Sequence, residues 1–186
     1  MIRRTLAIAL AVTTFLALQP VEPASAVGRA RVVRCKKPRA CWITAFAFTP
    51  AGDELFYVER YSGEIRRVVL ATGSDTRWTR IRGVAGVGEQ GALGIALDPD
   101  WESGEERVFV YYTQRRLERN LIVRLIKSAG KVQRKVLITI AATTFHDGGV
   151  LHFGPDGNLY AVTGDAGVPS RSQRVRNPAG KVLRME

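Results

Sequence analysis

The sequence predicts an all-β fold of the β-propeller type, because a strand, a turn and a second strand recur three times along the chain. Each recurrence is an apolar or alternating segment, then a turn built on proline with aspartate or glycine, then an aromatic strand. The turn prolines Pro50, Pro99 and Pro155 lie 49 and 56 residues apart. A period near 50 with several short strands is typical of propeller blades, and the sequence does not follow the 3.6-residue period of helical repeats.

Each recurrence extends to further strands. The first predicts strands at residues 43–48, 55–58, 64–70 and 77–82. The second predicts strands at residues 93–97, 108–112, 121–126 and 131–140. The third predicts strands at residues 150–153, 159–162 and 181–185. We therefore expect a partial propeller domain over residues 43–186, with two four-stranded blades and three strands of another.

The first 26 residues have the pattern of a secretory signal peptide. Arg3 and Arg4 form a basic start, residues 5–18 are uncharged and largely apolar, and Ala24-Ser25-Ala26 offers a cleavage site. The apolar run is short against the roughly 20 residues that span a bilayer. The sequence therefore predicts a secreted or periplasmic protein, with no stable membrane span, whose mature chain begins near Val27.

Export determines how the two cysteines are interpreted. Cys35 and Cys41 are separated by five residues within the segment 27–42 that precedes the predicted domain. In an oxidising compartment such a pair favours a local disulfide over a metal site. No histidine is close enough in sequence to complete a zinc set, so no metal ligand is predicted.

The chain is strongly basic, with a formal net charge of +11. For an exported protein, nucleic acid is excluded as the expected partner, and anionic cell-surface polymers, lipid head groups or an anionic small molecule fit the charge better. A solvated arginine-rich surface with no specific partner is an equally open interpretation. Arg171, Arg174 and Arg176 are expected to belong to such a solvated loop.

Five segments together resemble the soluble PQQ-dependent glucose/sorbosone (aldose sugar) dehydrogenases. They are GEQGALGIALDPDW at 88–101, HDGG at 146–149, FGPDGNLY at 153–160, TGD at 163–165 and GKVLR at 180–184. These dehydrogenases are six-bladed propellers and are usually exported. The resemblance runs from about Ala45 to the last residue and covers the N-terminal half of the family domain, so the chain is expected to be partial or truncated.

The resemblance implies a catalytic role for His146. In the family the matching histidine is the general base, which takes the proton of the sugar's anomeric hydroxyl as hydride passes to PQQ. A neutral imidazole can accept a proton at working pH, so the residue type suits the role. The family also binds calcium with PQQ, and the groups that hold both come mainly from later blades than those present in this sequence.

Two departures from the family pattern concern the site. Glu89 occupies a column where many relatives have a glutamine that helps to hold cofactor or substrate, and Gln90 follows it. Either Gln90 replaces that glutamine through a small loop shift or the site is altered, because a carboxylate would repel an acidic quinone. Phe145 stands where relatives often have an acidic or polar residue.

Asp147 and Asp165 are the remaining candidates, both for substrate binding. Asp147 is interpreted equally well as a partner of His146 or as a turn former, and Asp165 follows a strand in a Gly-Asp turn. His152 alternates with apolar residues on a strand and is expected to be a packed or edge histidine.

The resemblance as a whole implies an exported PQQ-dependent enzyme that oxidises the C1 position of aldoses, with a sugar substrate and an artificial or periplasmic electron acceptor. Two alternatives stay open. One is a non-catalytic propeller that binds carbohydrate or protein, and the other is an inactive truncated remnant. Calcium-dependent lactonases share the architecture, but the GEQG and HDGG segments suit the dehydrogenases better.

Overall fold

The computed structural model describes residues 42–101, 105–116 and 119–186. All of these residues belong to one unit of the chain, Val33–Glu186. The predicted signal peptide and the predicted disulfide between Cys35 and Cys41 lie outside the described residues. No helix in the described part of the chain is long and apolar enough to cross a membrane.

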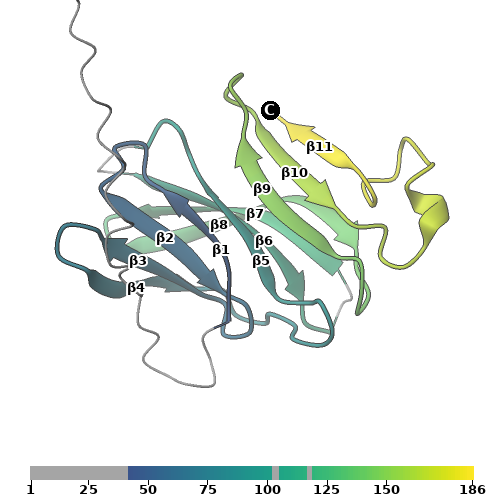
Figure 1. Ribbon diagram of the computed structural model, residues 1–186, viewed down its shortest axis with the longest axis horizontal. Helices are drawn as coiled ribbons and strands as arrows, with labels where there is room; N and C mark the ends of the chain where they lie inside the picture. The colour runs from purple at the N-terminus through teal and green to yellow at the C-terminus, as the bar shows by residue number, and fades with distance from the viewer. Residues whose placement is uncertain (1–41, 102–104, 117–118) are drawn as a thin grey trace, which may run out of the picture. The chain divides into compact units, whose positions relative to one another are not determined.

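The described strands form three antiparallel sheets that follow one another along the chain (Figure 1). Sheet 1 has the order β1-β2-β3-β4, with β1 at Ile43–Phe48, β2 at Glu54–Glu59, β3 at Glu64–Val69 and β4 at Ser74–Arg80. Sheet 2 has the order β5-β6-β7-β8, with β5 at Ala92–Leu97, β6 at Glu106–Gln114, β7 at Arg119–Ser128 and β8 at Lys131–Ala141. Sheet 3 has the order β11-β10-β9, with β9 at Gly148–Phe153, β10 at Leu159–Thr163 and β11 at Val182–Met185. The all-β prediction of two four-stranded blades and three strands of another is confirmed.

Two local differences from the prediction concern sheets 1 and 3. The fourth strand of sheet 1 begins at Ser74 and ends at Arg80, whereas the sequence predicted residues 77–82. The loop between β10 and β11 contains a short 3₁₀ helix, η1 at Pro169–Arg171. Proline at its first position has a backbone φ suited to a helical turn, which accounts for the helix.

Sheet 2 packs against sheet 1 with one face and against sheet 3 with the other, as the alternating side chains of β5 show. Ile95 and Leu97 belong to a hydrophobic cluster shared with Phe56 of sheet 1, whereas Ala96 belongs to a second cluster shared with Leu151 of sheet 3. Successive side chains of a strand point to opposite faces, so one strand serves two interfaces. This two-sided burial explains why β6 and β7 are almost continuously buried.

Close contact between the first strands of sheets 2 and 3 depends on glycine. A Cβ at Gly94 of β5 would lie 1.8 Å from the carbonyl oxygen of Gly149 in β9. No side chain fits in that space, so the two strands approach backbone to backbone. The approach fixes the N-terminal ends of β5 and β9 relative to each other, and the candidate site lies in the loops that lead into these ends.

The pairing of the first two strands is irregular in every sheet. The register shifts between Ile43 and Ala45 in β1, between Ala92 and Gly94 in β5, and between Ala161 and Thr163 in β10. Such bulges bend a strand and change the direction of its neighbouring side chains, and they are frequent beside active sites. In sheets 2 and 3 they lie next to the loops that carry the candidate residues.

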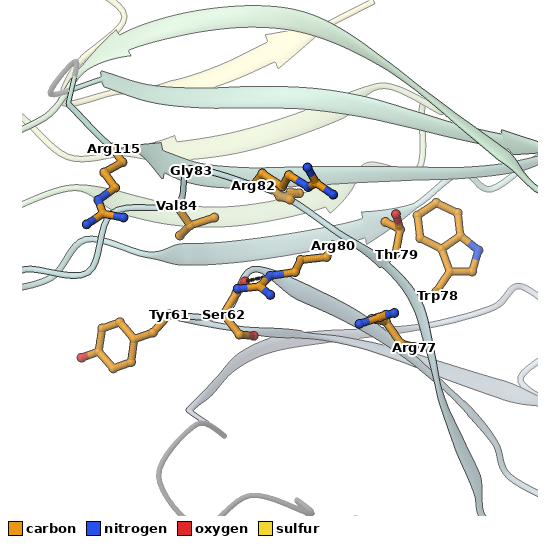
Figure 2. Close-up of a pocket in the computed structure, with 11 residues that line it drawn as sticks. Tyr61, Ser62, Arg77, Trp78, Thr79, Arg80, Arg82, Gly83, Val84 and Arg115 are labelled. Carbon is orange, nitrogen blue, oxygen red and sulfur yellow. Dashed lines mark hydrogen bonds between the residues drawn. The ribbon is translucent and has the colours of Figure 1, made fainter.

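A pocket of about 810 Å³ lies where loops of sheets 1 and 2 meet (Figure 2). Tyr61 and Ser62 from the loop after β2 line it, together with the segment 77–84 and Arg115 after β6. It is separate from the residues predicted by the sequence motifs.

Candidate active site

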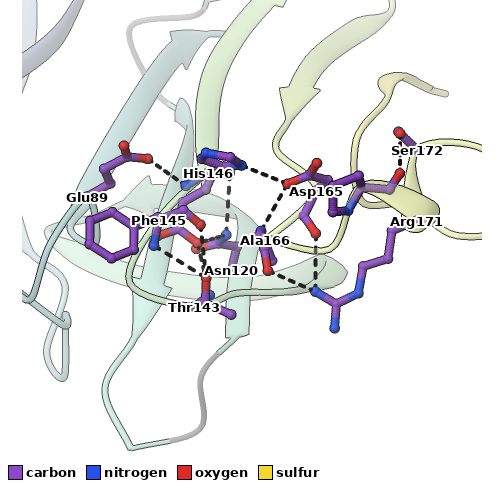
Figure 3. Close-up of polar contacts among 12 residues, drawn as sticks. Glu89, Asn120, Thr143, Phe145, His146, Asp165, Ala166, Arg171 and Ser172 are labelled. Atoms are coloured by element: carbon purple, nitrogen blue, oxygen red, sulfur yellow. Dashed lines mark hydrogen bonds and ion pairs between the residues drawn. The ribbon is translucent and has the colours of Figure 1, made fainter.

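Three loops meet at the ends of sheets 2 and 3 and carry the candidate residues (Figure 3). Residues 88–91 lead into β5, residues 142–147 lead into β9, and residues 164–168 follow β10. The backbone N–H of Glu89 donates to the carbonyl of Thr144 at 2.8 Å, and that of Ala166 donates to the carbonyl of His146 at 3.1 Å. The first and third loops are therefore both bonded to the loop that holds His146.

His146 adopts an unusual backbone conformation that these bonds stabilise. Its φ is 57°, in the left-handed region that residues other than glycine seldom occupy. Its backbone N–H donates to Oε2 of Glu89 at 2.6 Å. A Cβ at Gly164 would lie 1.6 Å from the His146 carbonyl oxygen, so only glycine allows this close approach of the two loops.

The side chain of His146 is exposed and has one carboxylate partner. Its Nδ1 lies 3.0 Å from Oδ1 of Asp165, and 63% of the His146 side chain is accessible against 20% for Asp165. Among the described residues, the other ring nitrogen, Nε2, has no hydrogen-bond partner. A carboxylate at Nδ1 favours the tautomer with the proton on Nδ1 and the lone pair on Nε2.

Asp165 also organises its own turn. Its Oδ1 accepts a hydrogen bond from the backbone N–H of Gly167 at 2.9 Å. Nη1 of Arg171 donates to the carbonyls of both Asp165 and Ala166, each at 3.2 Å. The predicted turn role and a role beside His146 are therefore combined in one carboxylate.

Glu89 is exposed, but its carboxylate faces the His146 loop rather than open solvent (Figure 3). The loop that carries it is held from the other side by Arg60, whose Nε donates to the Gln90 carbonyl at 2.9 Å and whose second nitrogen donates to the Gly88 carbonyl. Glu89 thus fixes the backbone of His146 in place.

Gln90 is only 7% exposed, and its side-chain amide donates to the carbonyl of Thr143 at 2.9 Å. Its side chain joins two loops beneath the surface. The predicted role of Gln90 in cofactor binding stays a prediction, and the geometry gives this amide a structural contact instead.

Asp147 is buried, although it follows an exposed histidine. It is 1% exposed, and its Oδ1 accepts hydrogen bonds from Nδ2 of Asn120 at 2.9 Å and from the backbone N–H of Thr143 at 3.4 Å. Its other oxygen, Oδ2, has no partner within the described structure. Burial is the main cause that raises the pKa of this carboxyl above its ordinary value.

A buried polar network continues from Asp147 into sheet 2. The Tyr111 hydroxyl donates to the Asp147 carbonyl at 2.7 Å, and the Thr113 hydroxyl donates to Oδ1 of Asn120 at 2.7 Å. Burial also raises the pKa of Tyr111, which keeps its hydroxyl protonated as a donor. The sequence motifs did not reveal these residues; the only signal was polar residues inside otherwise apolar strands.

Two further residues occupy informative positions. Phe145 is 58% exposed next to His146. His152 is exposed on β9, the edge strand of sheet 3, as the sequence predicted.

The cations bonded to the loops around His146 are not free to form a cradle for a tricarboxylate cofactor such as PQQ. Arg171 is committed to loop carbonyls, and Nζ of Lys181 donates to the carbonyls of Arg171, Ser172 and Ala179. The side chains that are hydrogen-bonded to His146 are the carboxylates of Glu89 and Asp165. The described part of the chain also contains no group of three His, Cys, Asp or Glu residues able to hold a metal ion.

Comparisons with known proteins agree with this fold. The family model of glucose/sorbosone dehydrogenase matches residues 39–186. The PQQ-bound aldose sugar dehydrogenase of Streptomyces coelicolor is 34% identical, with a TM-score of 0.69, over 83% of this chain and 47% of that chain. An oxidoreductase of Thermus thermophilus described as a glucose dehydrogenase is 32% identical, with a TM-score of 0.66, over 78% of this chain and 43% of that chain.

A third structure, the apo form of the soluble aldose sugar dehydrogenase of Escherichia coli, is 21% identical with a TM-score of 0.60 and supports the fold alone. It matches 76% of this chain and 43% of its own length. No curated protein matches the chain significantly. The chain spans less than half the length of each of these three structures. Because the family model covers well over half of the chain, the chain belongs to the glucose/sorbosone dehydrogenase family.

Proposed function

We propose that this chain carries the proton-accepting part of an exported sugar dehydrogenase, in which His146 takes the proton of the C1 hydroxyl of an aldose. The observation that supports the proposal is the exposed imidazole of His146 with Asp165 at 3.0 Å from Nδ1. A base must reach its substrate and must hold its lone pair toward it. Exposure meets the first requirement and the Asp165 contact meets the second.

The proton transfer follows from this pair. Nδ1–H donates to the Asp165 carboxylate, so Nε2 is the atom that accepts the hydroxyl proton. As Nε2 becomes protonated, the imidazolium gains attraction to the carboxylate of Asp165, which stabilises the charge that forms. The Glu89 bond to the His146 backbone keeps the ring in this place.

PQQ, when bound, would accept the hydride that leaves C1. The cations bonded to the site loops, Arg171 and Lys181, are occupied by loop carbonyls and are not free to hold its carboxylates. For calcium, the described residues contain no cluster of three or more Asp, Glu, His or Cys side chains able to hold the ion. The part of the reaction that belongs to this chain's own residues is therefore the proton transfer.

A second candidate function is a non-catalytic propeller that binds carbohydrate. Phe145 favours it, because an aromatic ring that is 58% exposed beside a polar cluster can stack on a sugar ring. This candidate predicts sugar binding that survives substitution of His146 and is lost in Phe145→Ala.

Sugar-dependent reduction of an artificial dye, measured with PQQ and calcium added, separates the two. We expect His146→Gln to lower the rate by about 10²- to 10⁴-fold, the usual contribution of a general base. The matched control is His152→Gln on β9, which should leave the rate unchanged. Equal, measurable rates in the wild type and His146→Gln would sink the general-base assignment, and binding without turnover would favour the second candidate.

We also propose export through cleavage after Ala26. The basic start, the apolar run and the small residues of the first 26 positions support it. Expression of the full chain in a bacterial host, followed by mass determination of the extracytoplasmic protein, should give a chain that begins near Val27. A product that keeps Met1 and stays with the cytoplasmic fraction would contradict export.

A further inference from the structure

Arginines dominate the pocket of about 810 Å³ between the loops of sheets 1 and 2 (Figure 2). Four of them line it: Arg77, Arg80, Arg82 and Arg115. No aspartate or glutamate is among its lining residues, all of which lie in the described part of the chain. The pocket is therefore a concave surface with positive charge on several sides.

Most of this charge is not neutralised. Arg77 lies 3.6 Å from Oε1 of Glu64, and Nε of Arg80 donates to the carbonyl of Ser62 at 2.8 Å. The side chains of Arg82 and Arg115 are exposed, and neither has a hydrogen bond or ion pair with any described residue. A guanidinium stays charged at every physiological pH, so these two groups present permanent cations that no described residue neutralises.

The pocket continues on both sides into neighbouring hollows. One, of about 730 Å³, shares Val84 and Arg115 with it, adds Arg116 and reaches Gln90 and Thr144. Thr144 belongs to the His146 loop and is bonded to Glu89. Because the two pockets share Val84 and Arg115, the basic pocket adjoins a hollow that reaches the loops of the candidate active site.

The other hollow, of about 220 Å³, extends the surface away from the site. It shares Arg80 and Arg82 with the central pocket and adds Arg134 from β8. Arg134 donates to the hydroxyl of Tyr112 at 2.9 Å, which does not neutralise its charge. We name the three connected pockets the arginine groove.

We propose that the arginine groove binds an acidic oligosaccharide, a chain of sugars with a carboxylate on successive units, and directs its end toward His146. The planar guanidinium matches a carboxylate with two parallel hydrogen bonds, and several arginines in a row suit a ligand with repeated charges. The continuity of the groove with the His146 loop identifies the ligand as a saccharide, and that identification rests on the proposed function. The family is named for neutral sugars, and the groove adds acidic oligosaccharides as a proposed substrate class of the same site.

Calorimetric titration with tetragalacturonate at low salt tests the groove, with neutral maltotetraose and tripolyphosphate as comparison ligands. The variant Arg82→Gln/Arg115→Gln should weaken tetragalacturonate binding about tenfold or more, because it removes two charged donors. Both residues are exposed and unpaired, so its thermal unfolding should match the wild type. The control variant Arg174→Gln/Arg176→Gln removes the same charge from an exposed loop and should bind like the wild type.

Three results would overturn the proposal: no binding of tetragalacturonate, equal weakening in both double variants, or binding of tripolyphosphate without tetragalacturonate. The titration needs neither cofactor nor turnover, so it is independent of the general-base assignment. His146→Gln should bind tetragalacturonate as the wild type does. A protein whose measurable rate is unchanged in His146→Gln and which still binds through Arg82 and Arg115 would refute the proton-transfer proposal and leave the groove supported.

Discussion

Two carboxyl groups lie on either side of His146, and the structure uses them in opposite ways. Asp147, the next residue in the chain, is buried and bonded to Asn120 of sheet 2. Asp165, distant in sequence, lies at the surface against the imidazole of His146. The pKa of Asp147 is raised by burial, which suits an interior support and not an ion-pair partner.

The difference divides the residues around His146 into a buried half that supports the loop and an exposed half that we propose takes part in proton transfer. The buried half is formed by Asp147, Asn120, Thr113 and Tyr111. Its hydrogen bonds anchor Asp147, and with it the loop backbone next to His146, to sheet 2. The exposed half, formed by Glu89, His146 and Asp165, presents the imidazole that we propose as the general base. Changes in the buried half should therefore alter stability first, and changes in the exposed half should alter proton transfer first.

Gly164→Ala should have the largest effect on stability, because the new Cβ would overlap the His146 carbonyl. We expect a loss of about 3 kcal/mol or more in the free energy of unfolding, measured by urea denaturation. Gly157→Ala is the control, since its Cβ meets no atom within 4 Å and only its φ of 73° is unfavourable. The control should cost about 1 kcal/mol, and equal losses in the two variants would contradict the close approach of the loops.

Asn120→Ala should come next. It leaves the Thr113 hydroxyl without its acceptor and removes the Asn120 donor from the Asp147 carboxyl, both in the interior. Unsatisfied buried partners cost about 1–3 kcal/mol each, so we expect a destabilisation of about 2 kcal/mol. The control Asn158→Ala, in a half-buried turn position whose side chain donates only to the Asp156 carbonyl at 3.2 Å, should change the unfolding free energy by less than about 0.5 kcal/mol. A neutral outcome for Asn120→Ala would show that the network does not support the loop.

The pH dependence of stability should expose Asp147 itself. A carboxyl whose folded pKa is raised stabilises the fold in its protonated form, and that contribution is lost as pH rises from the ordinary Asp pKa, about 3.9, through the folded value. Asp147→Asn cannot ionise, so its stability relative to the wild type should increase over this range. Urea denaturation at several pH values measures the difference, and a constant difference would refute the burial effect.

Asp165→Asn should have the smallest effect on stability. The pair with His146 is solvent-accessible, and such pairs contribute about 0.5 kcal/mol or less to the free energy of unfolding. Under the proposed function, the rate of sugar oxidation should nevertheless fall, because the variant loses the negative charge that would stabilise the imidazolium. A large loss of stability with an unchanged rate would contradict this assignment, because it would give Asp165 the supporting role assigned to Asp147.

The sequence was sufficient for the sheets and for the position of His146. Alternating apolar residues and proline turns predicted the strands, and the Gly-Gly pair after His146 placed it at a strand entrance, because these are local signals. The start of β4 was missed because Ser74 to Thr76 carry no apolar alternation.

The partners of His146 required the fold. Asp165 reaches the ring because β9 and β10 pair so that Thr163 lies opposite Gly148, a register that turn residues alone do not determine. The burial of Asp147 depends on Asn120, which belongs to a different sheet. The first contact is set by strand register within sheet 3 and the second by packing between sheets 2 and 3, and no neighbouring residues in the sequence encode either.

The central claim is that Asp165 holds His146 with its proton on Nδ1 and its lone pair on Nε2. The chain has two histidines, so a ¹⁵N-histidine NMR spectrum above the pH at which imidazoles are protonated resolves both rings. His152 has no side-chain partner among the described residues and gives the reference for an unconstrained ring. We predict the Nδ1–H tautomer for His146 and its loss in Asp165→Ala. An Nε2–H tautomer for His146, or one identical to that of His152 and unchanged in Asp165→Ala, would contradict the account.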